Sequence, residues 1–102
     1  MVDDMVPEPL RRRYIDTFPD KSAALSAALD LLANGDAAGP RSLRDQAHKL
    51  AGSAGMYGFD DVGQLAREIV HSVDGGTADA VGAGLTRDLI AILNSASVRF
   101  GL

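Results

Sequence analysis

Apolar residues recur at steps of three and four along most of this chain, which is the spacing of the buried face of an α-helix. The clearest case lies between residues 40 and 57. Its apolar stripe consists of Leu43, Ala47, Leu50, Ala54 and Tyr57. No segment alternates between apolar and polar residues over a useful length, so no β-strand is predicted. The pattern therefore predicts an all-α fold.

Two helices are predicted before this segment. The first covers residues 7–18 and is expected to end at Pro19, because a proline disfavours helical geometry in the residue before it. Its apolar positions are Leu10, Tyr14 and Phe18. The second begins at Asp20 as the N-cap and runs to about Asn34, where Gly35 suits the left-handed residue that often follows a helix.

Two more helices are predicted after it. Phe59 is expected to be a buried plug before Asp60, the N-cap of a helix that ends at the turn Asp74-Gly75-Gly76. The apolar stripe of this helix consists of Val62, Leu65, Ala66, Ile69 and Val73. The last helix is expected to begin near Thr77 or Ala78. Its stripe consists of Leu85, Leu89, Ile92 and Ala96.

Helices of these lengths with short connections favour antiparallel neighbours. We therefore expect an antiparallel up-down four-helix bundle, with residues 7–18 as a short additional N-terminal helix that acts as a lid. At 102 residues the chain is predicted to form a single domain, residues 1–102, around one core. The initiating methionine and the compact length favour a free protein over a domain excised from a larger kinase.

Composition and charge exclude several classes of function. The absence of cysteine excludes disulfides and thiolate chemistry and fits a reducing, cytoplasmic location. The formal net charge of -4 argues against nucleic-acid binding, because nucleic-acid binders usually present a basic face. No apolar run approaches the ~20 residues that span a bilayer, so no membrane association is expected. The acidic start Met-Val-Asp-Asp does not resemble a signal peptide.

A histidine and two glycines mark the helix over residues 40–57. His48 lies about 100° around this helix from Ala47, at the edge of the solvated face. Gly52 and Gly55 follow on the same face, although each glycine inside a helix costs roughly 0.5–1 kcal/mol relative to alanine. The glycines indicate either a bare surface that lets a large partner approach His48, or tight packing against another helix of this chain. Spacing alone leaves both explanations open.

A longer motif surrounds this histidine. The run His48-Lys49-Leu50-Ala51-Gly52-Ser53, with Gly58-Phe59 and Leu65-Ala66 after it, resembles the signature of the histidine-containing phosphotransfer (HPt) domain family. The resemblance implies that His48 accepts a phosphoryl group from the phospho-aspartate of a receiver domain and passes it to another receiver in a multistep phosphorelay. It implies response-regulator receiver domains and a hybrid histidine kinase as partners. No cofactor is expected on this chain, since the required magnesium belongs to the receiver.

The sequence departs from the family pattern at two positions. Ala51 stands where many members carry lysine, so Lys49 and Arg44 are the cations expected to stabilise the phosphoryl group. Val70 stands where many members carry an amide or an acid near the imidazole, which leaves the orientation of the ring open. The expected partner-docking residues are Ala51, Gly52, Gly55, Tyr14, Phe18 and Arg67, with a place in the core as the alternative for Tyr14 and Phe18.

Other chemistry finds little support in the sequence. His71 is expected to be an ordinary surface residue, and no metal site is predicted because His48 and His71 are not at local ligand spacing. The glycine-rich residues 52–58 lack P-loop order and a preceding strand, so no autonomous kinase activity is expected. The competing hypothesis is a helical adaptor or inhibitor that binds a kinase or receiver domain without taking phosphate. A dimerising kinase fragment is a third hypothesis, whereas a phosphocarrier is expected to be a monomer.

Overall fold

The computed structural model describes residues 6–100, with side chains placed for residues 6–96. Within this range the chain is helical and has no strand, so the predicted all-α class is confirmed. Its elements are α1 (Glu8–Asp16), α2 (Phe18–Ala33), α3 (Gly39–Ser53), the 3₁₀-helix η2 (Ala54–Tyr57), α4 (Asp60–Asp74), the π-helix η3 (Ala78–Gly82) and α5 (Ala83–Phe100). The acidic residues 1–4 lie outside the described residues.

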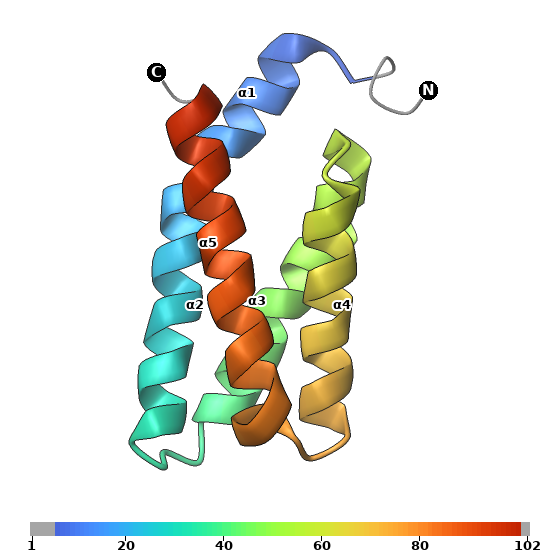
Figure 1. Cartoon of the computed structure of the whole chain (residues 1–102). Helices are drawn as coiled ribbons and strands as arrows, with labels where there is room; N and C mark the ends of the chain where they lie inside the picture. The colour runs from blue at the N-terminus through green and yellow to red at the C-terminus, as the bar shows by residue number, and fades with distance from the viewer. Residues whose placement is uncertain (1–5, 101–102) are drawn as a thin grey trace.

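The four long helices lie side by side, and α1 lies across one end of them, next to the C-terminal end of α5 (Figure 1). α3 and α4 run antiparallel, because Arg44 pairs with Asp74 while Gly55 lies against Gly63. In the register that these two contacts define, Val70 of α4 lies opposite His48 of α3. The core fills the space between the helices. Its largest fully buried side chains are Phe18, Leu25, Leu43, Leu50, Ile69, Leu89, Leu93, Val62 and Thr86.

The junction of the first two helices differs from the prediction. Pro19 does not end the first helix, because α1 already ends at Asp16 and Pro19 lies in the first turn of α2. Proline is tolerated there, since the N–H groups of a first turn have no acceptor within the helix. Phe18 is the first residue of α2, and Asp20, the predicted N-cap, lies inside that helix.

The turn between α3 and α4 differs from the prediction at the end of the helix and at the cap. The predicted helix to Tyr57 is divided, because α3 ends at Ser53 and the 3₁₀-helix η2 follows it. Gly58 ends η2 with a φ of 84°, a left-handed conformation that glycine adopts without strain. Phe59 is buried, as predicted. Asp60 is not the N-cap of α4, because Phe59 occupies the cap position. The neighbouring carboxylate of Asp61 instead accepts a hydrogen bond of 2.9 Å from the N–H of Val62.

The last helix begins at Ala78, as predicted, but its first turn is the π-helix η3. The predicted stripe of α5 packs on the core but is incomplete. Leu89 and Ala96 are buried, Leu85 and Ile92 are partly exposed, and Thr86 and Leu93 are completely buried. α5 packs against both α2 and α4, so its buried face is wider than a single stripe. The Thr86 hydroxyl can be buried because it donates a hydrogen bond of 2.6 Å to the carbonyl of Gly82.

Candidate functional site

His48 lies in the second half of α3 with its side chain exposed to solvent, as the helical period predicts. Ala47 and Leu50, on the inner side of the same helix, are buried in the core. Packing of the inner side therefore fixes the backbone under His48 while the imidazole stays outside. Arg44 lies one turn earlier on the same side of α3, at the spacing at which side chains of a helix are neighbours.

The surface after His48 is bare, and we call His48, Gly52 and Gly55 together the His48 face. A Cβ atom added at Gly52 would meet no heavy atom of the described residues within 4 Å. At Gly55 it would meet one carboxylate oxygen, that of Asp60, at 3.9 Å. Tight packing against another helix therefore does not explain Gly52, and the first of the two explanations from the sequence is the one that fits.

Arg44 does not lie free beside His48, because it forms an ion pair with Asp74 at the end of α4. Its Nε donates a hydrogen bond of 2.6 Å to Oδ1, and its Nη2 lies 3.4 Å from Oδ2. The bonded guanidinium lowers the pKa of the Asp74 carboxyl, and the nearby imidazoles of His71 and His48 act in the same direction. Asp74 is therefore within electrostatic reach of His48. The same hydrogen bond raises the pKa of Arg44.

The remaining predicted surface residues lie on different sides of α3. Lys49 is exposed and, with Lys21, borders a hollow between α2 and α3, so it lies on the α2 side. Arg67 is exposed on α4; its Nη2 donates to the side chain of Gln64 at 3.2 Å, and its Nη1 lies 3.8 Å from where a Cβ of Gly63 would be. Ala51 is partly buried and packs against the core.

Tyr14 and Phe18 are core residues, so their predicted place on a docking surface is wrong. Phe18 is completely buried, and Tyr14, a residue of the helix α1 that crosses the end of the bundle (Figure 1), is 7% exposed. The Tyr14 ring stacks on Tyr57 with 4.2 Å between centroids, and Phe59 completes the cluster. The Tyr14 hydroxyl lies 2.6 Å from Ser53 Oγ. Burial raises the pKa of Tyr14, and the hydrogen bond with Ser53 opposes this shift.

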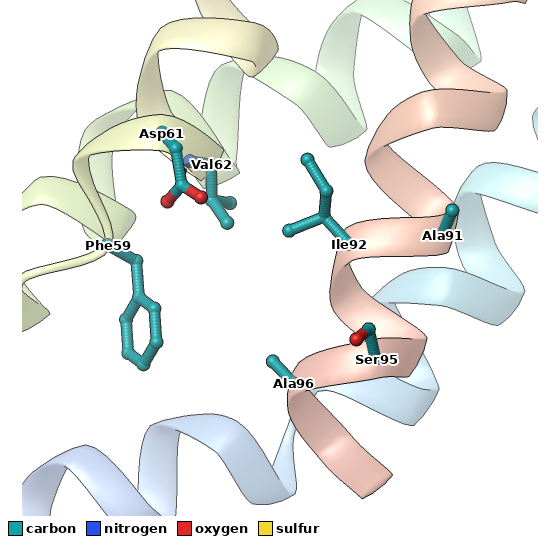
Figure 2. A pocket seen from close by; sticks show the side chains of 7 residues that line it. All are labelled: Phe59, Asp61, Val62, Ala91, Ile92, Ser95 and Ala96. Atoms are coloured by element: carbon teal, nitrogen blue, oxygen red, sulfur yellow. Dashed lines mark hydrogen bonds between the residues drawn. The ribbon is translucent and has the colours of Figure 1, made fainter. Parts of the chain in front are cut away.

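A separate hollow of about 370 Å³ lies between the start of α4 and the C-terminal half of α5 (Figure 2). Its lining is mainly apolar and consists of Phe59, Asp61, Val62, Ala91, Ile92, Ser95 and Ala96. None of these residues belongs to the His48 face. Within the described range, no group of three or more His, Cys, Asp or Glu side chains could hold a metal ion.

A comparison with protein families decides the assignment. The model of the Hpt domain matches residues 9–96, which is most of the chain and includes the whole His48 face. The chain belongs to the Hpt domain family. Searches of curated proteins and of solved structures gave no match. Hpt domains act in histidine phosphotransfer in two-component phosphorelays and interact with receiver domains and histidine kinases.

Two contacts of this Hpt domain were missed by sequence reasoning. Asp74 falls in a sequence that predicts a turn, and nothing local indicates that its carboxylate reaches Arg44 on another helix. Ser53 stands in the motif that carries the family resemblance, but its partner Tyr14 is 39 residues away in the chain. Both contacts depend on how the helices pack.

No helix in the described part of the chain is long and apolar enough to cross a membrane.

Proposed function

We propose that this Hpt domain accepts a phosphoryl group on His48 from the phospho-aspartate of a receiver domain and passes it to a second receiver. The observation that carries the proposal is the His48 face. An exposed imidazole on a packed helix is followed by Gly52, beside which the described structure leaves open space, and by Gly55, where an added Cβ would meet one carboxylate oxygen at 3.9 Å. Because Gly52 has no side chain, nothing at position 52 blocks a large partner from reaching this imidazole. The same face serves both acceptance and donation.

The proposed step needs little machinery on this chain. The lone pair of a neutral ring nitrogen of His48 attacks the phosphorus in line, and an N–P bond forms. The bond from phosphorus to the aspartyl oxygen breaks, and its electron pair leaves with the receiver's carboxylate. Magnesium on the receiver would carry most of the charge stabilisation. On this chain, Lys49 on the α2 side and Arg44 on the α4 side place positive charge near the phosphoryl oxygens.

The surroundings of His48 supply the proposed docking surface. Gly52 and Gly55 allow close approach, Ala51 is partly exposed beside them, and Arg67 adds a cation on α4. We propose that the chain works as a cytoplasmic monomer and as a single domain, residues 1–102, with a hybrid histidine kinase as the source of phosphate. In this proposal its fold is an antiparallel up-down four-helix bundle with α1 as the additional helix, and it has no kinase activity of its own.

Replacement of His48 tests the proposal. His48→Gln should fold normally, because the side chain is exposed, and should abolish acid-labile labelling by a phosphorylated receiver domain. The matched control is His71→Gln on α4, which also removes an exposed imidazole but leaves the proposed nucleophile in place. Circular dichroism would establish that both variants retain their helices, and transfer of radioactive phosphate from the receiver would be followed with time.

The same measurement separates the phosphocarrier from an adaptor. An adaptor would bind the phosphorylated receiver in a pull-down or by calorimetry without ever becoming labelled. Labelling that persists in His48→Gln and disappears in His71→Gln would move the site to α4 and contradict the proposal. Loss of labelling in His48→Gln alone is the expected result.

A further inference from the structure

The Arg44–Asp74 ion pair lies one helical turn from His48. Arg44 is one turn before His48 on α3, and Asp74 is one turn beyond Val70, the α4 residue opposite His48. The pair joins the two helices that border the imidazole on this side. A phosphoryl group on the ring would therefore come close to one cation and one anion that are bound to each other.

We propose that this pair sets the phosphoryl-transfer potential of His48, with Arg44 exchanging the Asp74 carboxylate for the phosphoryl group. Asp74 then acts against the phosphorylated state in two ways: it competes for the guanidinium, and it repels the phosphoryl oxygens. Arg44 acts in favour of that state. Arg44 contacts the phosphoryl group directly in this proposal, whereas Asp74 acts through Arg44 and through its charge. The inference rests on the proposed function because it concerns phosphorylated His48.

The ion pair is placed so that it can open. The side chains of Arg44 and Asp74 are 40% and 50% exposed, and exposed pairs of this kind contribute little to stability. A phosphoryl group carries more negative charge than a carboxylate and offers three acceptor oxygens, so it competes well for a guanidinium. The exchange requires a rotation of the Arg44 side chain and no movement of either helix.

Charged groups of both signs lie on the two helices that border His48, among them Arg41 on α3 and Glu68 on α4. On α3, Asp45 and Lys49 have opposite charges and flank His48 on either side in sequence. On α4, His71 lies within electrostatic reach of Asp74, whereas Arg67 points toward Gly63, away from Val70. On α4, Asp74 is the carboxylate that is hydrogen-bonded to Arg44, the neighbour of His48 one turn earlier on α3.

The consequence concerns the direction of phosphate flow. In the donating step the carboxylate of a receiver attacks the phosphorus, the N–P bond breaks, and its electron pair returns to the ring nitrogen. An anion beside the phosphoryl group raises the free energy of the phosphorylated state and so favours this step. With Asp74 in place, His48 passes its phosphoryl group on more readily than it would beside a neutral side chain.

An equilibrium with a small phosphodonor tests the inference without any partner protein. The full chain is mixed with phosphoramidate and ammonia at a fixed ratio, so that His48 and phosphoramidate exchange with phosphohistidine and ammonia. Intact-mass spectrometry at neutral pH gives the phosphorylated fraction. Asp74→Asn should raise the exchange equilibrium constant about two- to fivefold, and Arg44→Gln should lower it by a similar factor, which is the range of exposed charge interactions. Arg44→Lys retains the charge, so its exchange equilibrium constant should lie between those of Arg44→Gln and the unchanged protein.

The opposite signs distinguish this role from a structural one, because loss of a helix–helix contact would move both variants in the same direction. Asp88→Asn on α5 is the matched control for net charge and should leave the constant unchanged. In about 1 M salt the differences should shrink, because the Debye length falls to about 3 Å. If the constants of Asp74→Asn and Arg44→Gln changed in the same direction, or by no more than that of Asp88→Asn, the inference would be overturned. The proposed function would still stand as long as the unchanged protein became phosphorylated. Absence of any phosphohistidine in the unchanged protein would overturn the proposed function, and this inference with it.

Discussion

Gly52 has no side chain, and this absence affects both the stability of α3 and the space beside His48. A glycine inside a helix destabilises it relative to alanine, and in a packed bundle the usual compensation is close contact with another helix. Gly39 shows that case, because a Cβ there would lie 2.9 Å from the backbone nitrogen of Leu32. Gly52 faces open space within the described structure. Its destabilising effect is therefore best explained by the access that it leaves to His48.

Two substitutions at position 52 should separate stability from transfer. Gly52→Ala should raise the free energy of unfolding by about 0.5–1 kcal/mol, since it removes the helix penalty and adds no clash. Gly52→Leu should also fold, but it should slow phosphotransfer from a receiver by about tenfold or more, because displacement of reacting groups by about 1 Å can cost 10²-fold. Urea unfolding and the initial rate of labelling are the two measurements.

The control for position 52 is Gly84 on α5, where an added Cβ also meets no described atom within 4 Å. Gly84→Leu places the same side chain on another exposed helix and should leave the transfer rate unchanged. Gly39→Ala should destabilise the fold. If Gly52→Leu transferred phosphate at the unchanged rate, the His48 face would not be the docking surface.

At the scale of elements, the packing of α4 against the start of the last helix includes one close contact, between Gly82 and Ser72. A Cβ at Gly82 in η3 would lie 2.7 Å from the hydroxyl oxygen of Ser72 in α4, closer than a Cβ atom approaches a non-bonded heavy atom in real proteins. That hydroxyl donates a hydrogen bond of 2.7 Å to the carbonyl of Ile69 and is not free to rotate away at no cost. The small residue at position 82 therefore determines how closely the two helices pack.

Gly82→Ala should destabilise the protein by about 1–3 kcal/mol, the usual range for overpacking a well-packed core. Ser72→Ala alone should cost about 0.5–1.5 kcal/mol through loss of its hydrogen bond. The double variant should cost less than the two single costs combined, because Ser72→Ala removes the oxygen that an alanine at position 82 would strike. Urea unfolding of all four proteins measures this coupling, and strictly additive costs would show that the contact is not what excludes a side chain at position 82.

Helices could be predicted from the sequence better than their pairings. Periodicity alone placed α3 and the exposure of His48, since both depend on which residues of one helix are apolar. It could not show that Pro19 lies in the first turn of α2, because a proline can either follow the end of one helix or stand in the first turn of the next. It also could not show that Asp74 meets Arg44, which depends on the register of two helices and on the length of the turn between them.

At the scale of the whole molecule, aromatic residues from four segments hold one end of the bundle together. Tyr14 of α1, Phe18 of α2, Tyr57 of η2 and Phe59 before α4 contact one another, and the Tyr14 hydroxyl bonds to Ser53 at the end of α3. A sequence pattern identifies such residues as apolar but does not distinguish core from docking surface. Because α1 contributes to this cluster, it is part of the core and supports the segment that carries Gly52 and Gly55.

This closed cluster has a consequence at alkaline pH. Burial raises the pKa of Tyr14 above its ordinary value of about 10, so over a range of pH the folded protein keeps a proton that the unfolded chain has lost. The stability associated with neutral Tyr14 is fully present below about pH 10 and decreases as the pH rises through the folded pKa. Lys21, whose ammonium lies 5.2 Å from the Tyr14 ring centroid, acts in the opposite direction because burial lowers its pKa.

Tyr14→Phe isolates the contribution of the tyrosine, because Lys21 is unchanged in both proteins. Below pH 9 the variant should be less stable by about 0.5–1.5 kcal/mol, since the hydrogen bond to Ser53 is lost. Above about pH 10 the unchanged protein should lose stability more steeply than the variant, so the difference between them should narrow. Urea unfolding followed by circular dichroism from pH 7 to 11 measures both effects. A constant difference across this range would mean that Tyr14 ionises in the folded protein as readily as in the unfolded chain, and that α1 does not close this end of the bundle.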